Sequence, residues 1–242
     1  VSSTGHLIVV SEWLGQVDER AKTFDIFIQL GAILAIVWLY RHRLAHAAAG
    51  VRRDPANRRF VLNLAIAFLP AAAVGFLIHD WIKERLFNTP VVAAALVLGG
   101  IAILLIERWG PRTRFPEVTD VPQATALGIG IAQVLSLIPG VSRSGATIMG
   151  GYALGLSRQA ATEFSFFLAI PIMVAATLFD LAKTAGTLSP ADVPFFATGF
   201  VVSFISALVV VKAFLTYVSN HSFAVFAWYR IVFGVALLWL AR

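Results

Sequence analysis

Residues 124–147 read ATALGIGIAQVLSLIPGVSRSGAT, and this stretch decides the fold. Its first part is apolar enough for a membrane, yet it holds two glycines and Gln133 and runs straight into Pro139-Gly140. Irregular backbone is tolerated at membrane depth only where it is buried in protein or lines a wet cavity. The stretch therefore predicts a segment that enters the membrane, turns at Pro139-Gly140 and goes back.

The whole chain has the composition of an integral membrane protein. Of its 242 residues, 59% are hydrophobic and 13% are charged, whereas a soluble domain carries about 25% charged residues. The mean hydropathy is +0.82. These values exclude a soluble enzyme, a nucleic-acid-binding protein and a disordered chain. The lack of cysteine excludes disulfides and thiolate metal sites.

Six arginines lie in the segment 41–59, which contains a single acid, Asp54. In membrane proteins such a segment marks the cytoplasmic side, so the net charge of +6 does not indicate nucleic acid. With 41–59 inside, the loops 79–90 and 183–194 are expected outside and the loop 107–123 inside.

Seven apolar stretches are present, at about 24–40, 60–78, 91–106, 124–138, 164–182, 195–218 and 222–241. A bilayer core of about 30 Å needs about 20 helical residues, so most of these stretches predict spans. We expect an all-α polytopic membrane protein with about six transmembrane helices, forming a single integral membrane domain over 1–242. The chain opens at Val1 inside what looks like a motif, which predicts that an N-terminal piece is absent.

An internal repeat relates the two halves of the chain at an offset of 140 residues. The segment VSSTGHLI that begins at Val1 lies over VSRSGATI at Val141, with four of eight positions identical. The same offset, without a gap, lays 21–27 over 161–167. We predict a duplication, with repeat one at about 1–118, truncated at its N-terminus, and repeat two at about 119–242.

The number of crossings between equivalent points decides the orientation of the two copies. If the stretch 124–138 is re-entrant, three crossings separate the copies and they are inverted. Inverted-topology repeats are typical of transporters and place a site at the repeat interface near mid-membrane. We expect the two Ser/Gly segments to meet there from opposite sides.

Arg143 is the strongest candidate for chemistry. An arginine at membrane depth is costly and indicates function by default, and its planar fork binds phosphate in a bidentate way. Ser142, Ser144 and Thr147 add hydroxyls, and Gly145 lets backbone N–H groups approach an anion at a helix start. The alternative is a Gly/Ser-rich packing interface with a snorkelling arginine. Phosphate binding is favoured.

Ser3 and His6 form a second, weaker candidate. At a helical spacing of three residues they share a face, and histidine is the usual base for a serine nucleophile. A capped helix start with a bystander histidine explains the pattern equally well. Among other ionisable groups, Asp25 and Glu163 lie near helix starts, and Arg230 is interpreted as part of a structural ion pair.

These motifs resemble the two signatures of the bacterial undecaprenyl-diphosphate phosphatase family of the bacitracin-resistance type. The carriers of the resemblance are VSSTGHL at 1–7 and PGVSRSGAT at 139–147, with further similarity at 21–31, 161–171 and 229–234. The resemblance implies hydrolysis of undecaprenyl diphosphate to the monophosphate and inorganic phosphate, which recycles the lipid carrier for peptidoglycan synthesis and confers bacitracin resistance. It also implies inverted repeats with re-entrant helix pairs.

Roles follow from the resemblance residue by residue. Arg143 would grip the diphosphate, and Ser3 and His6 would act as nucleophile and acid/base partner in an undecided division of labour. The diphosphate-binding set would be Ser2, Thr4, Ser142, Ser144, Gly145 and Thr147. The family depends on a divalent cation, Mg²⁺ or Ca²⁺, whose acidic ligands would lie upstream of Val1. Gln133 is the repeat counterpart of the first of them. We therefore expect this chain to have an incomplete metal site and little activity by itself.

The resemblance places the protein in a bacterial cytoplasmic (inner) membrane, with the polyprenyl diphosphate lipid and the phospholipid bilayer as partners. The active site would face the periplasmic side, and a homodimer is possible. The competing hypothesis is a flippase, or transporter, for the polyprenyl phosphate carrier, which needs Arg143 but no nucleophile. A structural scaffold ranks last because it leaves a membrane arginine and its hydroxyl cluster unexplained.

Overall fold

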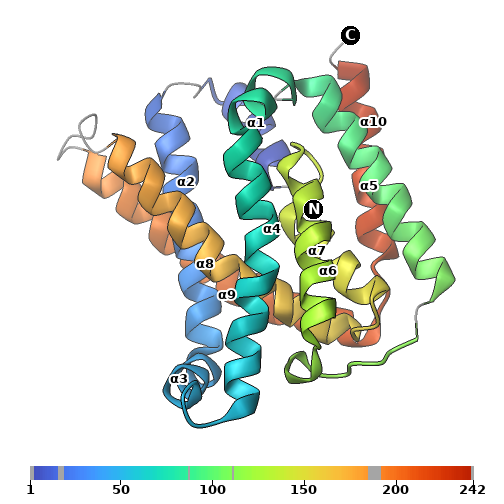
Figure 1. Ribbon diagram of the computed structural model, residues 1–242. Coiled ribbons are helices and arrows are strands. Elements are labelled where there is room, and N and C mark those ends of the chain that lie inside the picture. The colour runs from blue at the N-terminus through green and yellow to red at the C-terminus, as the bar shows by residue number, and fades with distance from the viewer. Residues whose placement is uncertain (1–2, 16–18, 87, 111, 185–191, 241–242) are drawn as a thin grey trace.

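A computed structural model describes residues 3–15, 19–86, 88–110, 112–184 and 192–240, and in these ranges it is helical apart from turns and one isolated β-bridge (Figure 1). The elements are α1 (Ser3–Trp13), α2 (Glu19–Leu39), α3 (Arg41–Gly50), α4 (Pro55–Leu86), α5 (Thr89–Trp109), η1 (Val118–Asp120), α6 (Gln123–Val134), η2 (Leu135–Leu137), α7 (Arg143–Ala153), α8 (Arg158–Thr184), α9 (Val193–Asn220) and α10 (Ala224–Leu240).

The long helices confirm an all-α polytopic membrane protein. Among the described residues four helical segments are long and apolar enough to cross a membrane: Pro55–Ile78, Thr89–Trp109, Arg158–Leu178 and Val193–Asn220. A fifth span results if α2 and α3, which meet at a 74° bend, count as one. Helix α10 is apolar but shorter, with 17 residues. The count therefore stays below the six spans expected from apolar stretches alone.

Helices α6 and α7 form the turn-back that the sequence predicts. Phe115, ahead of α6, pairs with Leu156, just after α7, in the isolated bridge. The N–H of Arg114 donates to the carbonyl of Gly155 at 2.8 Å. Both ends of the hairpin therefore lie at the same side of the molecule, and the predicted turn-back at Pro139-Gly140 is confirmed, while its re-entry into the membrane stays a prediction.

The repeat offset also appears in the helix bounds. Helix α1 spans Ser3–Trp13 and α7 spans Arg143–Ala153, so both ends of the two helices are 140 residues apart. The next helices, α2 and α8, begin at nearly the same offset. These bounds agree with a duplication, while the inverted orientation of the copies stays a prediction.

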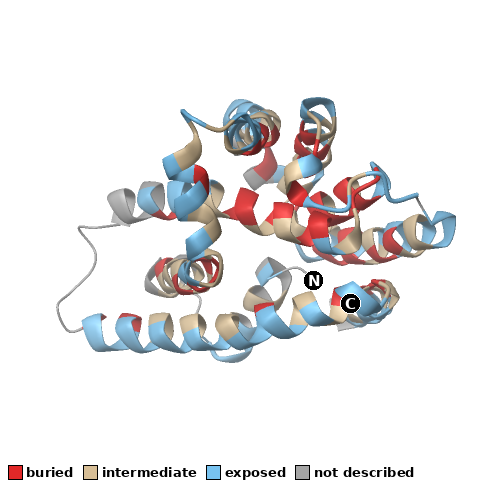
Figure 2. Ribbon diagram, turned by 90° about the horizontal axis from the view of Figure 1, so that it is seen from below, coloured by how far each residue is buried: buried red, intermediate tan, exposed pale blue. Residues whose placement is uncertain are grey.

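Close helix pairs surround the hairpin. Helix α5 packs along α10, α2 along α9 and α4 along α6. Glycines permit the approach: a Cβ added at Gly100 of α5 would lie 2.7 Å from the carbonyl oxygen of Ala227, and one at Gly31 of α2 would lie 2.5 Å from that of Phe200. Packing of small residues is the usual basis of helix association in lipid. The outer faces of these helices are exposed (Figure 2).

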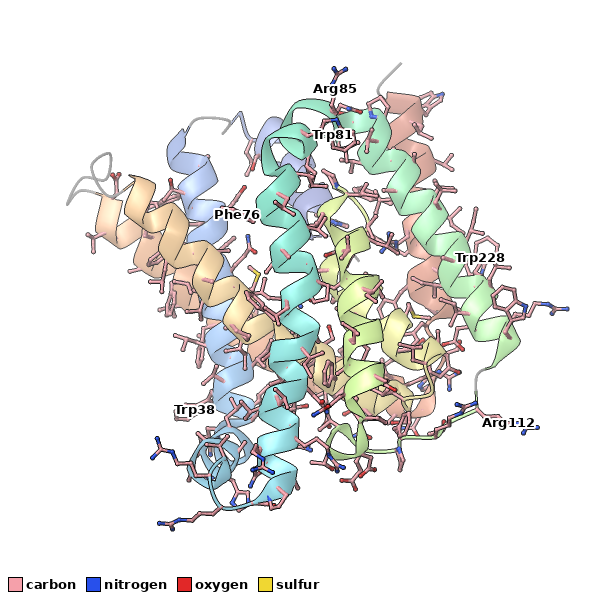
Figure 3. The ribbon with its side chains drawn as sticks, in the orientation of Figure 1. Trp38, Phe76, Trp81, Arg85, Arg112 and Trp228 are labelled. Atoms are coloured by element: carbon pink, nitrogen blue, oxygen red, sulfur yellow. The ribbon has the colours of Figure 1, made fainter. Side chains whose placement is uncertain are left out.

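One end of the molecule is basic and tied by ion pairs. The segment 41–50, taken as a loop from the sequence, is instead the helix α3. Arg43 of α3 pairs with Glu163 of α8 at 3.1 Å, and Arg158 pairs with Glu107 of α5 at 2.6 Å. Glu163 is thus an ion-pair partner at this end. Arg112 lies at the same end of the molecule, whereas Trp81 and Arg85 lie at the opposite end (Figure 3).

Candidate active site at the re-entrant turn

The turn between η2 and α7 presents a helix N-terminus inside the protein. Gly140 has a φ of +94° and Ser142 a φ of +74°, the left-handed region that a serine rarely adopts. At Gly140 an added Cβ would lie 2.5 Å from the carbonyl oxygen of Val92, so only glycine allows the turn to approach α5 this closely. Strain of this kind at a non-glycine residue is concentrated at functional sites.

Ser142 caps α7. Its Oγ accepts a hydrogen bond from the N–H of Gly145 at 3.1 Å, and its carbonyl accepts from the N–H of Ala146 at 2.9 Å. The two preceding N–H groups, of Arg143 and Ser144, make no hydrogen bond to the described part of the chain. Free N–H groups at the positive end of a helix form an anion-binding site.

Arg143 begins this helix and has donors to spare. Its Nη1 donates to the carbonyl oxygen of Ser165 on α8 at 3.3 Å, a long bond. A guanidinium carries five N–H donors. The others make no hydrogen bond to the residues that the structure describes, although the side chain is only partly exposed. Arg143 is thus available to a bidentate anion such as phosphate.

Arg230 of α10 has the opposite character. It is buried, with 1% of its surface exposed, and four backbone carbonyls hold it. Its Nη1 donates to Val141 at 2.8 Å and its Nη2 to Gly140 and Ala95 at 3.1 Å each, while Nε donates to Leu96 at 3.4 Å. The interpretation of Arg230 as an ion-pair partner is wrong: among the described residues its hydrogen bonds go to carbonyls, which bind the turn to α5.

The hydroxyls of Ser144 and Thr147 lie in different surroundings. Ser144 lies within 3.3 Å of the Ser142 Oγ and, with Gly145 and Arg230, lines a cavity of 280 Å³. Thr147 is buried, and its Oγ1 donates to the carbonyl of Arg143 at 3.0 Å and lies 2.7 Å from the Ser165 Oγ. Thr147 therefore anchors α7 to α8 directly beneath the arginine.

His6 is held by α10 rather than by Ser3. Its Nε2 lies 2.7 Å from the hydroxyl of Tyr229, and its ring stacks on Phe233 with centroids 4.5 Å apart. Ser3 is exposed, and no hydrogen bond joins it to His6 or Arg143 within the described residues. Ser2 and the side chain of Thr4 lie outside the described residues.

Tyr229 and Arg230 contact the signature segments, and sequence reasoning did not place them at the site. These neighbours on α10 reach the two signature segments separately, Tyr229 to His6 and Arg230 to the turn at 140–141. Arg230 could be noticed as a charge in an apolar stretch, but its partners are backbone carbonyls, which leave no pattern in a sequence.

The described residues do not make a metal centre. Among them there is no group of three or more His, Cys, Asp or Glu that could hold an ion. Near the turn they supply hydroxyls, whereas Mg²⁺ and Ca²⁺ prefer carboxylate oxygens. Gln133 is buried at 1% exposure in α6, and its Oε1 has no partner among these residues.

Comparison with known proteins agrees across the whole chain. The sequence profile of the bacitracin resistance protein BacA matches residues 1–236. The chain is 54% identical over 238 residues to an undecaprenyl-diphosphatase of Aromatoleum aromaticum, covering 98% of this chain and 87% of that protein. Undecaprenyl-diphosphatases of Methylococcus capsulatus and Ectopseudomonas mendocina are 52% and 51% identical, over 98% of this chain and 87% and 86% of theirs.

Proposed function

Since the chain belongs to the family of the bacitracin resistance protein BacA, we propose that it hydrolyses undecaprenyl diphosphate to undecaprenyl phosphate and inorganic phosphate. The observation that carries this to particular residues is the contrast between two arginines. Four of the five N–H donors of Arg230 are bound to carbonyls, whereas Arg143 lies at a helix N-terminus and makes a single hydrogen bond from its side chain. A diphosphate is the ligand that this second arrangement fits.

In the proposed reaction the turn binds the diphosphate and the opposite segment attacks it. The guanidinium of Arg143 and the backbone N–H groups of Arg143 and Ser144 neutralise the negative charge on the phosphate oxygens. This charge increases on the leaving phosphate as the bridging P–O bond breaks. Undecaprenyl phosphate is the leaving group. Thr147 positions Arg143 through the carbonyl that it contacts.

We assign the attack on the terminal phosphorus to the hydroxyl of Ser3, with His6 taking its proton. The new Ser3 P–O bond is then broken by water, which releases inorganic phosphate and returns the proton to the serine. Tyr229 holds the imidazole of His6 in place through the 2.7 Å contact. A catalytic pair that is not yet hydrogen-bonded in the substrate-free protein is common, because such contacts tighten when substrate binds.

A divalent cation is a further proposed requirement, which stands on the resemblance alone because the described residues do not fit a metal site. We expect EDTA to abolish phosphate release and Mg²⁺ or Ca²⁺ to restore it. Phosphate release that is indifferent to EDTA would contradict the requirement and leave the assignments to Arg143 and Ser3 untouched.

We propose that the site opens to the outer side of a bacterial cytoplasmic membrane. Gly140 contacts Val92, only three residues after the start of α5, so the turn lies toward the end of the molecule that is remote from α3. The arginines of α3 and its flanking segments mark the cytoplasmic end.

Phosphate release from undecaprenyl diphosphate in detergent tests the proposal. In the full-length protein with Mg²⁺ present, we expect release by the wild type, a loss of about a hundredfold or more in kcat for Arg143→Ala, and a larger loss for Ser3→Ala. Arg112→Ala, an exposed arginine in the loop after α5, is the matched control and should keep full activity. No release by folded protein, together with transfer of labelled polyprenyl phosphate across vesicles, would favour a flippase.

A further inference from the structure

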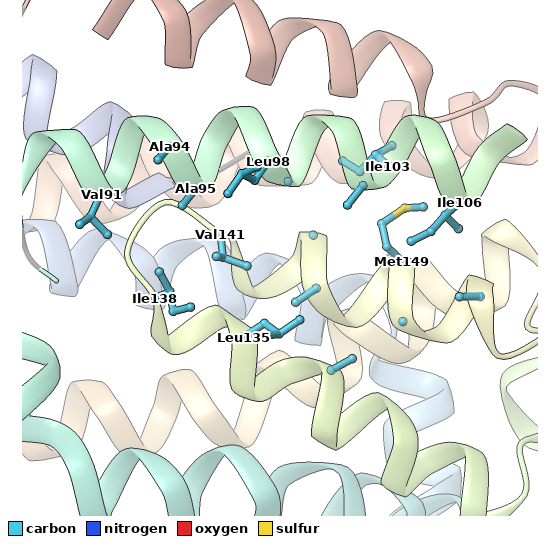
Figure 4. Close-up of a pocket in the computed structure, with 17 residues that line it drawn as sticks. Val91, Ala94, Ala95, Leu98, Ile103, Ile106, Leu135, Ile138, Val141 and Met149 are labelled. Atoms are coloured by element: carbon cyan, nitrogen blue, oxygen red, sulfur yellow. The ribbon is translucent and has the colours of Figure 1, made fainter. Parts of the chain in front are cut away.

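An apolar groove runs from the signature turn along α5 and α7. It encloses a cavity of 560 Å³ and is lined by 17 residues, none of which has a polar side chain (Figure 4). This volume lies within the range of about 300–1,000 Å³ that ligand pockets occupy. The lack of any polar lining side chain excludes a headgroup as the occupant and indicates a hydrocarbon.

The groove has a buried floor and an exposed rim. Ala95, Ile103 and Met149 on the floor are each at most 7% exposed. Leu98 and Leu135 on the rim are 66% and 57% exposed. The groove therefore opens sideways, toward the surface that meets the bilayer, and a lipid chain can enter it without leaving the membrane.

Small residues on both walls keep the groove open. Helix α5 contributes Ala94, Gly99 and Ala102, and α7 contributes Ala146 and Gly150. Small residues at this spacing usually let two membrane helices touch. Here they line a cavity between the two helices instead. A space of this size between packed helices forfeits dispersion contacts unless something fills it.

One end of the groove is formed by the signature turn. Ile138 and Val141 line that end, and Gly145, next to Ser144 in α7, lines the wall beside it. From Gly145 the groove follows α7 to Ala153 for about 12 Å, toward the end of the molecule that carries α3. A lipid whose diphosphate binds at Arg143 from the outer side would extend its tail in this direction.

We propose that this groove binds the first isoprene units of the polyprenyl chain of the substrate. The assignment rests on the proposed phosphatase function, since it takes the diphosphate to lie at Arg143. An acyl chain of a phospholipid and a second copy of this protein are the competing occupants, and neither accounts for the continuity of the groove with the turn.

Filling the groove at two depths tests the proposal kinetically. Ala94→Phe lies near the turn and Ala102→Phe about 12 Å farther along α5. We expect Ala102→Phe to raise KM for undecaprenyl diphosphate about tenfold, the effect of displacing roughly two buried methylenes, and to leave KM for the much shorter geranyl diphosphate unchanged. Ala94→Phe should raise KM for both substrates.

Ala73→Phe is the matched control, because Ala73 is exposed on the spanning part of α4 and does not line the groove. It should leave KM for both substrates unchanged. Equal KM values for wild type, Ala102→Phe and Ala73→Phe would overturn the proposal, as would an equal effect of Ala102→Phe on the long and the short substrate.

A photoaffinity probe separates failure of the groove from failure of the proposed function, because it needs no turnover. The probe is an undecaprenyl diphosphate analogue with a diazirine in the isoprene unit nearest the diphosphate. We expect crosslinks within α5 and α7, suppressed by Ala94→Phe and by excess undecaprenyl diphosphate. Crosslinks to other helices, or competition by phosphatidylglycerol alone, would overturn the proposal even if the protein is fully active.

Discussion

At the scale of single residues, the two membrane-embedded arginines differ in what satisfies them. Arg230 has four carbonyl partners, and Arg143 has one at 3.3 Å. A guanidinium in an apolar setting is stabilised only if its donors are paired. Arg230 finds its partners within the protein, while most donors of Arg143 make no hydrogen bond to the described residues. Substitutions at the two positions should therefore separate stability from activity.

Arg143→Lys tests whether geometry as well as charge is needed at the turn. A lysine keeps the charge but offers a point donor in place of a planar fork. We expect phosphate release to fall at least tenfold while the thermal melting temperature in detergent stays near that of the wild type. Wild-type rates for Arg143→Lys would show that the site needs only a positive charge.

Arg230→Met should mainly unfold the turn. It leaves the carbonyls of Gly140 and Val141 without donors and frees the turn from α5. Because hydrogen bonds to a charged group contribute about 1.5–3 kcal/mol each, we expect a loss of about 3 kcal/mol or more in the free energy of unfolding. A melting curve in detergent measures it. Arg143→Ala, measured in parallel, should lower the melting temperature far less, and the reverse order would refute this division.

At the scale of elements, the glycines of α5 and α4 meet different neighbours. A Cβ at Gly100 would lie 2.7 Å from both the Ala227 carbonyl oxygen and Ile231 Cγ1, whereas one at Gly75 would lie 3.3 Å from the flexible end of Leu137. Both changes to alanine gain helix propensity, so their difference reports helix packing alone. The contact between α5 and α10 matters for the site because Arg230 reaches the turn from α10.

Gly100→Ala should therefore be destabilising and Gly75→Ala nearly neutral. Overpacking at a close helix contact costs about 1–3 kcal/mol, and the backbone carbonyl of Ala227 cannot move without its helix. We expect a lower melting temperature and reduced phosphate release for Gly100→Ala. Equal melting temperatures for the two variants would mean that α10 shifts freely along α5, contrary to the tight pairing.

Elements were predicted better than contacts between them. The length of the apolar stretches predicted the spans, and the Pro139-Gly140 pair predicted the turn-back. Both features are local properties of the chain. The helix α3 was missed because six arginines in 41–59 read as a loop. The local spacing placed His6 beside Ser3, but the ring pairs with Tyr229, which lies 223 residues away in the chain. Contacts of that range depend on tertiary packing, which spacing does not encode.

At the scale of the whole molecule, charge and apolar surface define an axis. The outer face of α9 exposes Val201, Val202 and Ile205, as expected for a surface that meets lipid. The ion pairs of Arg43 and Arg158 close one end, and the strained turn opens toward the other. In the proposed function this axis keeps the diphosphate of the lipid near the outer surface, and in the proposed groove its tail follows the membrane interior.

This axis predicts which end of the protein faces the cytoplasm. The chain has no cysteine, so Arg85→Cys and Arg112→Cys each create a single thiol, at exposed positions on opposite ends (Figure 3). Because arginine-rich segments stay inside, a membrane-impermeant maleimide should label Arg85→Cys in intact spheroplasts and Arg112→Cys only after permeabilisation. Both variants should label fully in detergent, as the control for reactivity. Labelling of Arg112→Cys in intact spheroplasts would place the turn on the cytoplasmic side, where the substrate would have to be drawn from the inner leaflet.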